Sequence, residues 1–305
     1  MQSELKNFLT TRSFAIYGMG KTGLSVINYL KNNNNLNVTY WDDDKEKKKL
    51  YNLNNKKKKH FVNSLDRVDY IVISPGVSIR NIQLKKKLIK NNKKIITDID
   101  LFYLINPKVK SIIVTGTNGK STTCKIILHL LKKNKINSFL GGNIGKPILD
   151  LKIVNNSVVI IEASSYQLAY SRFINPTYAL ILNISNDHLD WHGTFKNYKT
   201  AKMKIFSNQK KSDYAFINNK NLIKDFKKQK YKSKLKIVNL NAFIKIKNKI
   251  KNKYLNSKLN NENLSFVFEL SKIFKIKTTS FTKSLNSFRG LPHRHEIFYT
   301  KNNVK

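Results

Sequence analysis

Short apolar runs alternate along the chain with longer stretches whose apolar residues recur every three or four positions. Short runs are typical of buried strands, and the longer spacing is typical of helices with one buried face. The pattern predicts strands at 13–17, 37–41, 70–73, 94–97, 112–114, 158–161, 178–182, 214–217 and 236–240, and helices at 24–31, 84–90, 124–133, 198–206, 262–274 and 283–288. Residues 243–258, rich in lysine, asparagine and isoleucine, are predicted to form hairpin strands and loops.

A glycine-containing turn follows the apolar run at 112–114. Residues 116–122 read Gly-Thr-Asn-Gly-Lys-Ser-Thr, and a helical pattern begins directly after them. In such a strand–turn–helix unit, backbone N–H groups face a phosphate, the lysine adds a positive charge, and a hydroxyl can bind Mg²⁺. The strict P-loop pattern has a further glycine where Val114 stands, so this turn is a shortened relative. It predicts a site for nucleotide phosphates.

A second glycine motif lies near the N-terminus. Residues 18–23 match G-x-G-x-x-G between a predicted strand and a predicted helix, and Asp42 ends the next strand. This βαβ arrangement holds a nucleotide diphosphate at the glycines and a ribose or base at the acidic residue, and by itself it suggests NAD. The turn Ser74-Pro75-Gly76 ends the strand at 70–73, either on the same ligand-binding edge or as a plain strand-ending turn.

Both motifs lie where strands alternate with helices, which predicts an α/β fold with parallel sheets. The pair Asn106-Pro107 interrupts the periodicity just before the strand at 112–114, so a domain boundary is expected there. We expect a Rossmann-like domain at residues 1–106, a central P-loop-type ATP-binding domain at 107–290, and a short further segment at 291–305.

Polar residues follow several strands of the predicted central domain. Glu162 ends the strand at 158–161, beside the phosphate-loop strand, which is a usual place for a Mg²⁺ ligand. Asn143 lies among three glycines at 141–145, in an expected loop where an amide can reach a ligand. His188 is either a metal or phosphate ligand or an ordinary polar loop residue. Composition alone does not separate Lys202 from the other lysines.

Composition limits the class of protein. The 305 residues carry a formal net charge of +40, which suggests a nucleic-acid partner. The lysines are nevertheless spread over the whole chain with abundant asparagine and isoleucine, as AT-rich codons would produce, so we expect no specific nucleic acid. No apolar run reaches the ~18 residues of a membrane span. The single cysteine, Cys124, fits a buried helix position in a reducing compartment. We expect a cytoplasmic protein without membrane insertion.

Taken together, the motifs resemble those of the Mur ligases over nearly the whole chain. The matching segments are G-T-N-G-K-S-T, G-G-N-I-G, E-A-S-S-Y-Q-L, N-D-H-L-D, Y-K-T-A-K-M-K-I-F and G-L-P-H-R, in this order, beginning at residues 116, 141, 162, 186, 198 and 290. The segment at 162–168 and the turn at 74–76 resemble the D-glutamate-adding member of the family.

The resemblance implies ATP, two Mg²⁺ sites and a CO₂-derived carbamate on Lys202. Implied to hold ATP are Gly116, Thr117, Asn118, Gly119, Lys120, Ser121, Thr122, Asn260 and Arg294. The implied metal ligands are Ser121 or Thr122 with Glu162 at one site, and His188 with Lys202 at the other. Lys120, Glu162, His188 and Lys202 form the implied catalytic group. The carbamate matters because a free ammonium cannot bind a metal, whereas a carbamate presents anionic oxygens.

The resemblance also implies the substrates. The UDP-substrate is implied to contact Lys21, Thr22, Asp42, Ser74, Pro75, Gly76, Asn143 and His188. The implied reaction joins D-glutamate to UDP-N-acetylmuramoyl-L-alanine through an acyl phosphate, for peptidoglycan synthesis, in a monomeric enzyme. Its demands are charge neutralisation and the alignment of three substrates.

Two features depart from the family pattern. Leu259 stands where the family usually has a histidine, beside Asn260. The chain also stops at Lys305, shortly after Arg294, where the family continues into a third domain that carries most of the acceptor site. We therefore expect the 305-residue chain to bind the UDP-substrate and ATP with little ligase activity.

Other interpretations compete with the ligase. An NAD-dependent oxidoreductase would explain residues 18–23 and Asp42, but it leaves the turn at 116–122 unexplained. Another ligase of the superfamily, such as a folylpolyglutamate synthase or a different Mur ligase, would share that turn, although the first domain argues against the folate enzyme. A non-catalytic, basic nucleic-acid-binding protein would account for the net charge of +40.

Overall fold

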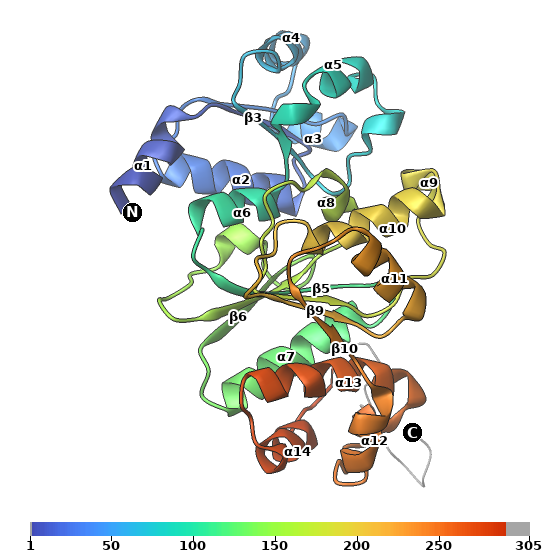
Figure 1. Ribbon diagram of the computed structural model, residues 1–305. Coiled ribbons are helices and arrows are strands. Elements are labelled where there is room, and N and C mark those ends of the chain that lie inside the picture. The colour runs from blue at the N-terminus through green and yellow to red at the C-terminus, as the bar shows by residue number, and fades with distance from the viewer. Residues whose placement is uncertain (1, 291–305) are drawn as a thin grey trace, which may run out of the picture.

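Two parallel β-sheets organise the chain, and the computed structural model describes residues 2–290 of it (Figure 1). The N-terminal sheet has the strand order β2-β1-β3-β4, and the central sheet has the order β10-β9-β8-β5-β7-β6. The strand pairs run parallel in both sheets. The predicted α/β fold is confirmed. In each parallel sheet the carboxyl ends of all strands meet at one edge, where ligands usually bind.

The N-terminal sheet consists of short strands joined by helices. Its strands are β1 (Phe14–Tyr17), β2 (Val38–Trp41), β3 (Tyr70–Ile73) and β4 (Ile95–Ile96). Its helices are α1 (Gln2–Thr11), α2 (Lys21–Asn32), α3 (Lys45–Leu50), α4 (Asn55–Ser64), η1 (Ile79–Asn81), α5 (Lys85–Lys90) and η2 (Asn92–Lys94). The lysine-rich α3 and α4 escaped prediction because they lack an apolar stripe. The side chains of Asp44 and Asn54 cap them by accepting backbone N–H groups of the first turn.

The central sheet carries the longer elements. Its strands are β5 (Lys110–Thr115), β6 (Ser138–Gly142), β7 (Val158–Glu162), β8 (Tyr178–Ile181), β9 (Tyr214–Ile217) and β10 (Lys234–Ile237). The helices around it are α6 (Asp98–Ile105), α7 (Lys120–Lys133), η3 (Ile148–Asp150), α8 (Ser165–Tyr170), α9 (Leu189–His192), α10 (Phe195–Met203), η4 (Lys204–Phe206), α11 (Lys220–Lys228), α12 (Leu240–Lys247), η5 (Lys253–Asn256), α13 (Lys258–Ile273) and α14 (Thr278–Asn286). Figure 1 shows α6, α8 and α10 on one face of the sheet and α7, α13 and α14 on the other.

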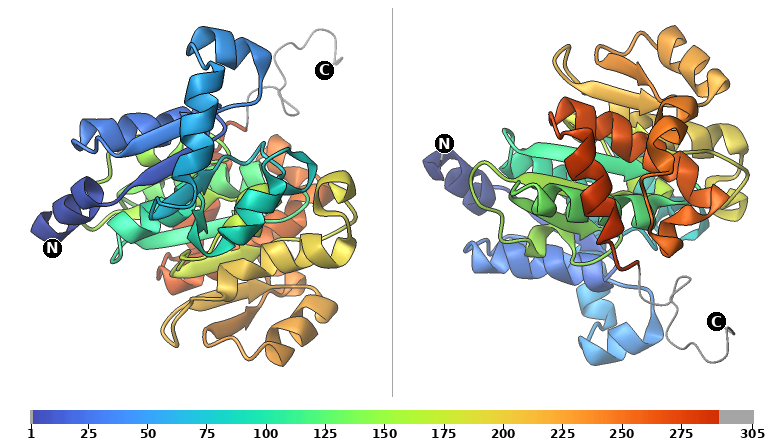
Figure 2. Two further views of the ribbon diagram at one scale, coloured as in Figure 1. Left: turned by 90° about the horizontal axis from the view of Figure 1, so that it is seen from above. Right: turned by 90° about the horizontal axis from the view of Figure 1, so that it is seen from below.

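Helix α6 joins the cores of the two sheets. It begins with a capping box between Thr97 and Asp100. Its buried Leu101 and Phe102 belong to one hydrophobic cluster that also contains side chains of β1 and β3 and one face of the central sheet. A second cluster fills the space between the other face and helices α7, α13 and α14, the side that the view from below in Figure 2 presents.

The region 243–258 was predicted wrongly as hairpin strands and loops. It contains most of α12, followed by η5. Asn239 caps α12, and Phe243 is fully buried with its ring centroid 6.4 Å from that of Phe268 on α13. The local alternation of isoleucine and lysine favours a strand, but the packing of Phe243 against α13 stabilises a helix instead.

Three smaller predictions also need correction. Gly141 and Gly142, expected in a loop, are the last residues of β6. The strand expected at 236–240 lies at 234–237. The last helix begins at Thr278 and not at 283, because Phe281 and Leu285 are both buried on its inner face.

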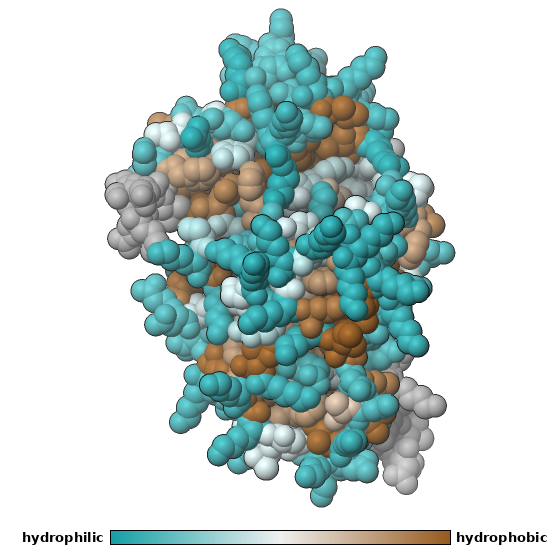
Figure 3. All heavy atoms as spheres, viewed as in Figure 1, coloured by the Kyte–Doolittle hydropathy of each residue, from teal (hydrophilic) through white to brown (hydrophobic). Residues whose placement is uncertain are grey.

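Hydrophilic side chains cover most of the face seen in Figure 3, with smaller hydrophobic patches between them. Between residues 2 and 290, no helix has the length and apolar character needed to cross a membrane.

Two glycines of the first motif let the chain pack against itself. Gly18 has a φ of +96°, and a Cβ built on Gly23 would lie 1.9 Å from the carbonyl oxygen of Gly18. The hydroxyl of Ser74 donates to the same carbonyl at 2.6 Å. The motif therefore closes β1, α2 and β3 tightly together at the carboxyl edge of the N-terminal sheet.

We expect Gly23→Ala to destabilise the protein by about 2–4 kcal/mol, because its methyl group would collide with backbone that cannot move aside. Gly20→Ala is the matched control, since its Cβ position has no neighbour within 4 Å. Urea unfolding followed by circular dichroism measures both variants. Equal stability of the two variants would contradict the packing role of Gly23.

Candidate functional site

The loop between β5 and α7 is fixed by side chains from the segment after β8. Gly119 precedes α7 with a φ of +83°, a conformation that favours glycine. The N–H of Asn118 donates to Asn183 Oδ1 at 2.8 Å, and the N–H of Thr117 donates to the Asn183 carbonyl at 3.0 Å. Thr117 Oγ1 lies 2.9 Å from the hydroxyl of Tyr198 on α10. These bonds preorganise a glycine loop at the N-terminus of a long helix, where anions bind.

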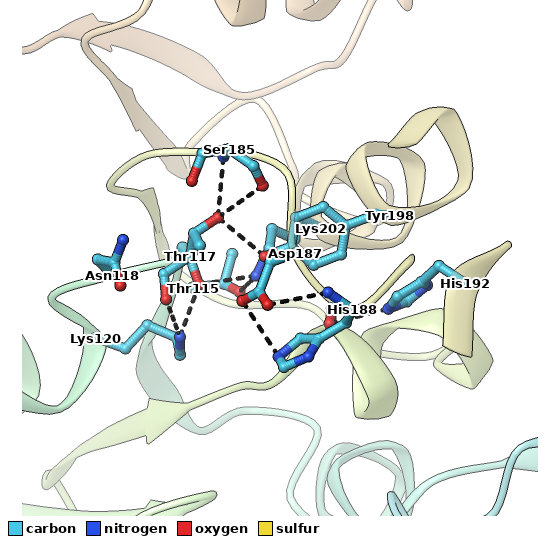
Figure 4. A network of polar contacts seen from close by, with 12 residues as sticks. Thr115, Thr117, Asn118, Lys120, Ser185, Asp187, His188, His192, Tyr198 and Lys202 are labelled. Atoms are coloured by element: carbon cyan, nitrogen blue, oxygen red, sulfur yellow. Dashed lines mark hydrogen bonds and ion pairs between the residues drawn. The ribbon is translucent and has the colours of Figure 1, made fainter. Parts of the chain in front are cut away.

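Two lysines meet on one carbonyl oxygen of this loop (Figure 4). Lys120 Nζ and Lys202 Nζ each donate to the carbonyl of Gly116 at 2.8 Å. Lys120 also donates to the carbonyl of Thr117 at 2.7 Å. Lys202 comes from α10, and its Nζ lies 4.7 Å from the centroid of the Tyr198 ring. The loop therefore concentrates positive charge where phosphates would sit.

Lys202 is buried to an extent that is rare for a lysine, with 1% of its surface exposed. Burial lowers the pKa of its amine to about 7, and the charge of Lys120 acts in the same direction. The carboxylate of Asp187 has the opposite effect on this pKa. A large fraction of the amine is therefore neutral, and hence nucleophilic, near pH 7.

Glu162 ends β7 directly beside the phosphate loop. One carboxylate oxygen accepts the side-chain N–H of Asn143 at 3.0 Å. The other oxygen, Oε2, is buried and has no hydrogen-bond partner. The nearby thiol of Cys124 has a raised pKa, mainly through burial and then through the charge of Glu162, so it is no nucleophile. An unpaired buried carboxylate oxygen calls for a cation or a donor that a ligand would bring.

The predicted metal ligands do not form a conventional cluster in the described part of the chain. Among residues 2–290, no group of three or more His, Cys, Asp and Glu side chains is placed to hold a metal ion. Ser121 and Thr122 lie in the first turn of α7. A cation beside Glu162 would therefore need hydroxyl and phosphate oxygens as further ligands, which is the usual coordination of Mg²⁺ at phosphates.

His188 lies on the turn between β8 and α10. It has a φ of +51°, and its Nε2 lies 3.3 Å from Asp187 Oδ2. Its side chain is 42% exposed, and its ring packs 4.8 Å from that of Tyr166 on α8. It is thus accessible to a ligand while its orientation is restrained on both sides.

His192, four positions further on, is a buried partner that sequence reasoning missed. Its Nε2 lies 3.0 Å from Ser165 Oγ, and its ring stacks with that of Tyr166. Burial lowers its pKa to about 4, with further contributions from Lys202, His188 and Arg80. It is therefore neutral at pH 7 and packs within an aromatic cluster composed of Tyr166, Tyr170, His188, Trp191, His192 and Tyr198.

The residues predicted to hold the UDP-substrate in the first domain lie at the carboxyl edge of the N-terminal sheet. Asp42 accepts the backbone N–H of Met19 at 2.5 Å and pairs with Lys47 at 3.3 Å. Its carboxylate therefore fixes the loop at 18–20, as Ser74 does from β3. Lys21 and Thr22 open α2, and the turn that begins at Ser74 continues through Pro75 and Gly76.

The structure divides the predicted site residues into two groups. Residues 116–122, Asn143, Glu162, His188 and Lys202 lie at the carboxyl edge of the central sheet. Lys21, Thr22, Asp42 and residues 74–76 lie at the carboxyl edge of the N-terminal sheet. Asn260 donates to the carbonyl of Tyr254 at 2.9 Å. Arg294 lies outside the described residues.

Sequence reasoning missed Asn183, Tyr198, His192 and Asn263. A Cβ built on Gly119 would lie 2.3 Å from Asn263 Oδ1, so this asparagine of α13 closes directly over the loop. Its position three residues after Asn260, on the same helical face, was the signal that could have identified it. Asn183 is the first polar residue after β8, which was a similar signal.

Comparison with known proteins identifies both parts of the chain. Residues 114–285 match the Mur ligase middle domain, and residues 12–97 match the Mur ligase MurD-like N-terminal domain. The UDP-N-acetylmuramoylalanine–D-glutamate ligase of Rickettsia prowazekii (strain Madrid E) is 33% identical over 319 residues, which cover 98% of this chain and 71% of the relative. The enzyme of the same name from Rickettsia bellii (strain RML369-C) is 34% identical over 310 residues, covering 93% and 68%.

Solved structures share the fold. The UDP-N-acetylmuramate:L-alanyl-γ-D-glutamyl-meso-diaminopimelate ligase from Neisseria meningitides superposes with a TM-score of 0.58 at 15% identity, over 92% of this chain and 99% of that one. The UDP-N-acetylmuramate–alanine ligase from Thermotoga maritima gives a TM-score of 0.51 at 19% identity, over 95% and 72%. At these identities the likeness concerns the fold.

We expect Lys202→Met to stabilise the protein by about 1–3 kcal/mol at pH 7 in CO₂-free buffer, because it removes a buried cation. Since the pKa of Lys202 falls to about 7 on folding, the native chain binds fewer protons than the unfolded chain between pH 7 and the ordinary lysine pKa of 10.5. The stability of the unmodified protein therefore rises with pH across this window, and the advantage of the variant shrinks.

Urea unfolding at several pH values measures this effect. Lys199→Met, on the same helix, is the control, because Lys199 pairs with Asp225 at the surface and its loss should cost at most about 1 kcal/mol. A Lys202→Met chain that is less stable than the unmodified protein at pH 7 would contradict the buried-charge account.

Proposed function

The chain belongs to the Mur ligase family, and we propose from this membership that it serves the ATP-dependent addition of D-glutamate to UDP-N-acetylmuramoyl-L-alanine in peptidoglycan synthesis. One observation carries the proposal. A phosphate-type loop, the unpaired carboxylate oxygen of Glu162 and the buried amine of Lys202 meet at the carboxyl edge of one parallel sheet. An enzyme that activates a carboxylate with ATP needs these groups together.

The loop at 116–122 would hold the phosphates of ATP. Its backbone N–H groups and the N-terminus of α7 favour negative charge. Lys120 already bonds the carbonyls of Gly116 and Thr117, so a phosphate need only draw its amine a short way from the loop. Asn263, which closes over Gly119, would border the nucleotide on the side of α13.

The residues at Glu162 fit a Mg²⁺ ion. Ser121 or Thr122 would supply a hydroxyl and Glu162 Oε2 an anionic oxygen, with phosphate oxygens completing the set. His188 and a carbamylated Lys202 would hold the second ion. When bound, Mg²⁺ would neutralise phosphate charge and orient the reacting oxygens. The support for these two sites is chemical: Glu162 has a buried oxygen without a hydrogen-bond partner, and His188 and the buried amine of Lys202 both contact the Tyr198 ring.

The microenvironment of Lys202 favours carbamylation. A neutral amine attacks CO₂, forms an N–C bond and releases one proton, which leaves a carbamate anion on the side chain. Burial beside Lys120 keeps a large fraction of the amine neutral near pH 7, and the same positive surroundings stabilise the anion that forms. Thr115 Oγ1 accepts from Nζ at 3.4 Å, while its own hydroxyl donates to the carbonyl of Ala163 at 2.9 Å.

In the proposed reaction, the carboxylate of UDP-N-acetylmuramoyl-L-alanine attacks the γ-phosphorus of ATP, and ADP leaves. The amine of D-glutamate then attacks the acyl carbon, phosphate leaves, and an amide bond forms with loss of a proton. The N-terminal edge around Ser74 would hold the uridine diphosphate, while Asn143 and His188 would orient the reacting end. The contribution of the protein is positioning and charge stabilisation, with Lys120 facing the transferred phosphoryl group.

The competing interpretations have less support. The NAD-dependent oxidoreductase and the nucleic-acid-binding protein find no support in the family matches, which cover both glycine motifs.

We further infer that the enzyme is cytoplasmic, since ATP and UDP-linked precursors are cytoplasmic metabolites. We also infer that it is a monomer.

Calorimetric titration tests the function directly. We expect saturable binding of UDP-N-acetylmuramoyl-L-alanine and of ADP–Mg²⁺, and no binding of NAD. Lys120→Met should weaken ADP–Mg²⁺ binding by about tenfold or more, because one charge-assisted contact is lost. Lys125→Met, one turn further along α7, should leave the affinity unchanged. Binding of NAD without the UDP-sugar would overturn the ligase assignment.

Carbamylation has its own measurement. With ¹³C-bicarbonate, we expect one carbamate carbon resonance from the unmodified protein and none from Lys202→Met. The signal should weaken below pH 7, where the amine becomes protonated. Lys199→Met serves as the control for reaction at other lysines of α10. A resonance that survives in Lys202→Met would place the modification elsewhere.

A further inference from the structure

The turn that carries His188 has little support of its own. Helix α9 spans only Leu189–His192, and the residues on both sides of it, His188 and Gly193, have positive φ angles of 51° and 79°. Such a single turn is too short to be stable in isolation. The position of His188 therefore depends on contacts from outside the turn.

Some of these contacts come from the N-terminal domain. The backbone N–H of Ile79 donates to the hydroxyl of Tyr170 at 2.9 Å. The ring of Tyr170 packs against Trp191 of α9, 5.4 Å between centroids. The guanidinium of Arg80 lies directly on Gly193, since a Cβ built there would be 1.7 Å from Arg80 Nη1. Two successive residues of η1 thus contact the turn, one through Tyr170 and one directly.

The same segment of chain begins at the proposed uridine diphosphate edge. Ser74 bonds the carbonyl of Gly18, and the N–H of Val77 donates to the Ser74 carbonyl at 3.0 Å. Only Ser78 separates Val77 from Ile79. A short, hydrogen-bonded segment therefore runs from the first glycine motif to the turn that carries His188.

The aromatic cluster extends this path to the phosphate loop. Trp191 packs against Tyr166, whose ring contacts that of His188. Tyr198 contacts His192 and bonds Thr117, and Lys202 lies over its ring. Beside this path a pocket of about 660 Å³ opens between the two domains, lined by Ile79, Arg80, Tyr170 and Trp191 among others. The contact at Tyr170 and Arg80 thus borders open space on the side of this pocket.

We propose that Tyr170 and Arg80 are positioning residues, which hold the His188 turn in place and tie it to the substrate edge of the N-terminal domain. This inference rests on the proposed function for the identity of the substrate, but the positioning itself is a property of the free chain. Its consequence is that occupation of the first domain and the order of the His188 turn are coupled.

The positioning role of Tyr170 and Arg80 is tested on the protein without ligand. The sequence contains two tryptophans, Trp41 and Trp191, so labelling with 5-fluorotryptophan gives two ¹⁹F resonances, assigned with Trp191→Phe. We expect Tyr170→Phe and Arg80→Gln to shift or broaden the Trp191 resonance and to leave that of Trp41 in place. Tyr178→Phe, in the central sheet outside the cluster, should change neither. Melting curves confirm that each variant folds. An unchanged Trp191 resonance in both test variants would overturn the proposal.

The coupling is measured with UDP-N-acetylmuramoyl-L-alanine. In the unmodified protein the ligand should shift the Trp191 resonance, and in Tyr170→Phe and Arg80→Gln this response should be lost while calorimetric affinity stays within about threefold. A response retained in both variants contradicts the coupling. Absence of calorimetric binding to the unmodified protein contradicts the proposed function instead, and the spectra of the free chain still decide the positioning.

Discussion

The side-chain amines of Lys120 and Lys202 both donate to the carbonyl of Gly116, and much of the site follows from this shared contact. Both lysines bond backbone oxygens of the loop, and Lys202 is almost completely buried. Like charges in a poorly hydrated place raise each other's free energy unless anions arrive or protons leave. Both remedies are chemically meaningful, because phosphates are anions and a deprotonated amine is a nucleophile. The arrangement therefore favours the binding of an anion or the loss of a proton from Lys202.

The parallel sheet makes this convergence possible at low conformational cost. Strands β7 and β8 flank β5 on its two sides. The loop after β5, the carboxylate that ends β7 and Asn183 after β8 therefore lie at the same edge of the sheet. Glu162 lies in register with Val114, two residues before the loop begins. The rigid strands set the positions, and the polar residues that follow them supply the chemistry.

The strands and the phosphate loop could be predicted from the sequence because their signals are local: a run of isoleucine and valine, then glycines, then a lysine. Glu162 and Asn143, each singled out separately in the sequence, are joined by a hydrogen bond in the structure. The residues that fix this loop from other elements, Asn183 and Tyr198, could not be predicted in the same way. Asn183 lies 65 positions from Asn118, and Tyr198 lies 81 positions from Thr117, so only the folded chain brings them together. Helices α3 and α4 were missed because their lysine-rich sequences lack an apolar stripe, and α12 was missed because its isoleucines and lysines alternate locally as in a strand.

The two sequence families that match this chain meet near α6, yet the hydrophobic cluster does not divide there. Leu101 and Phe102 pack into a core that reaches from the N-terminal sheet to Ile113 and Ile161 of the central one. Cutting the chain at that point would expose an apolar face on each half, and each half would tend to aggregate. The boundary between the two family matches therefore does not separate two parts of the chain that fold independently. Partial unfolding or proteolysis should instead begin elsewhere, in segments such as α12 that pack mainly on one neighbouring helix.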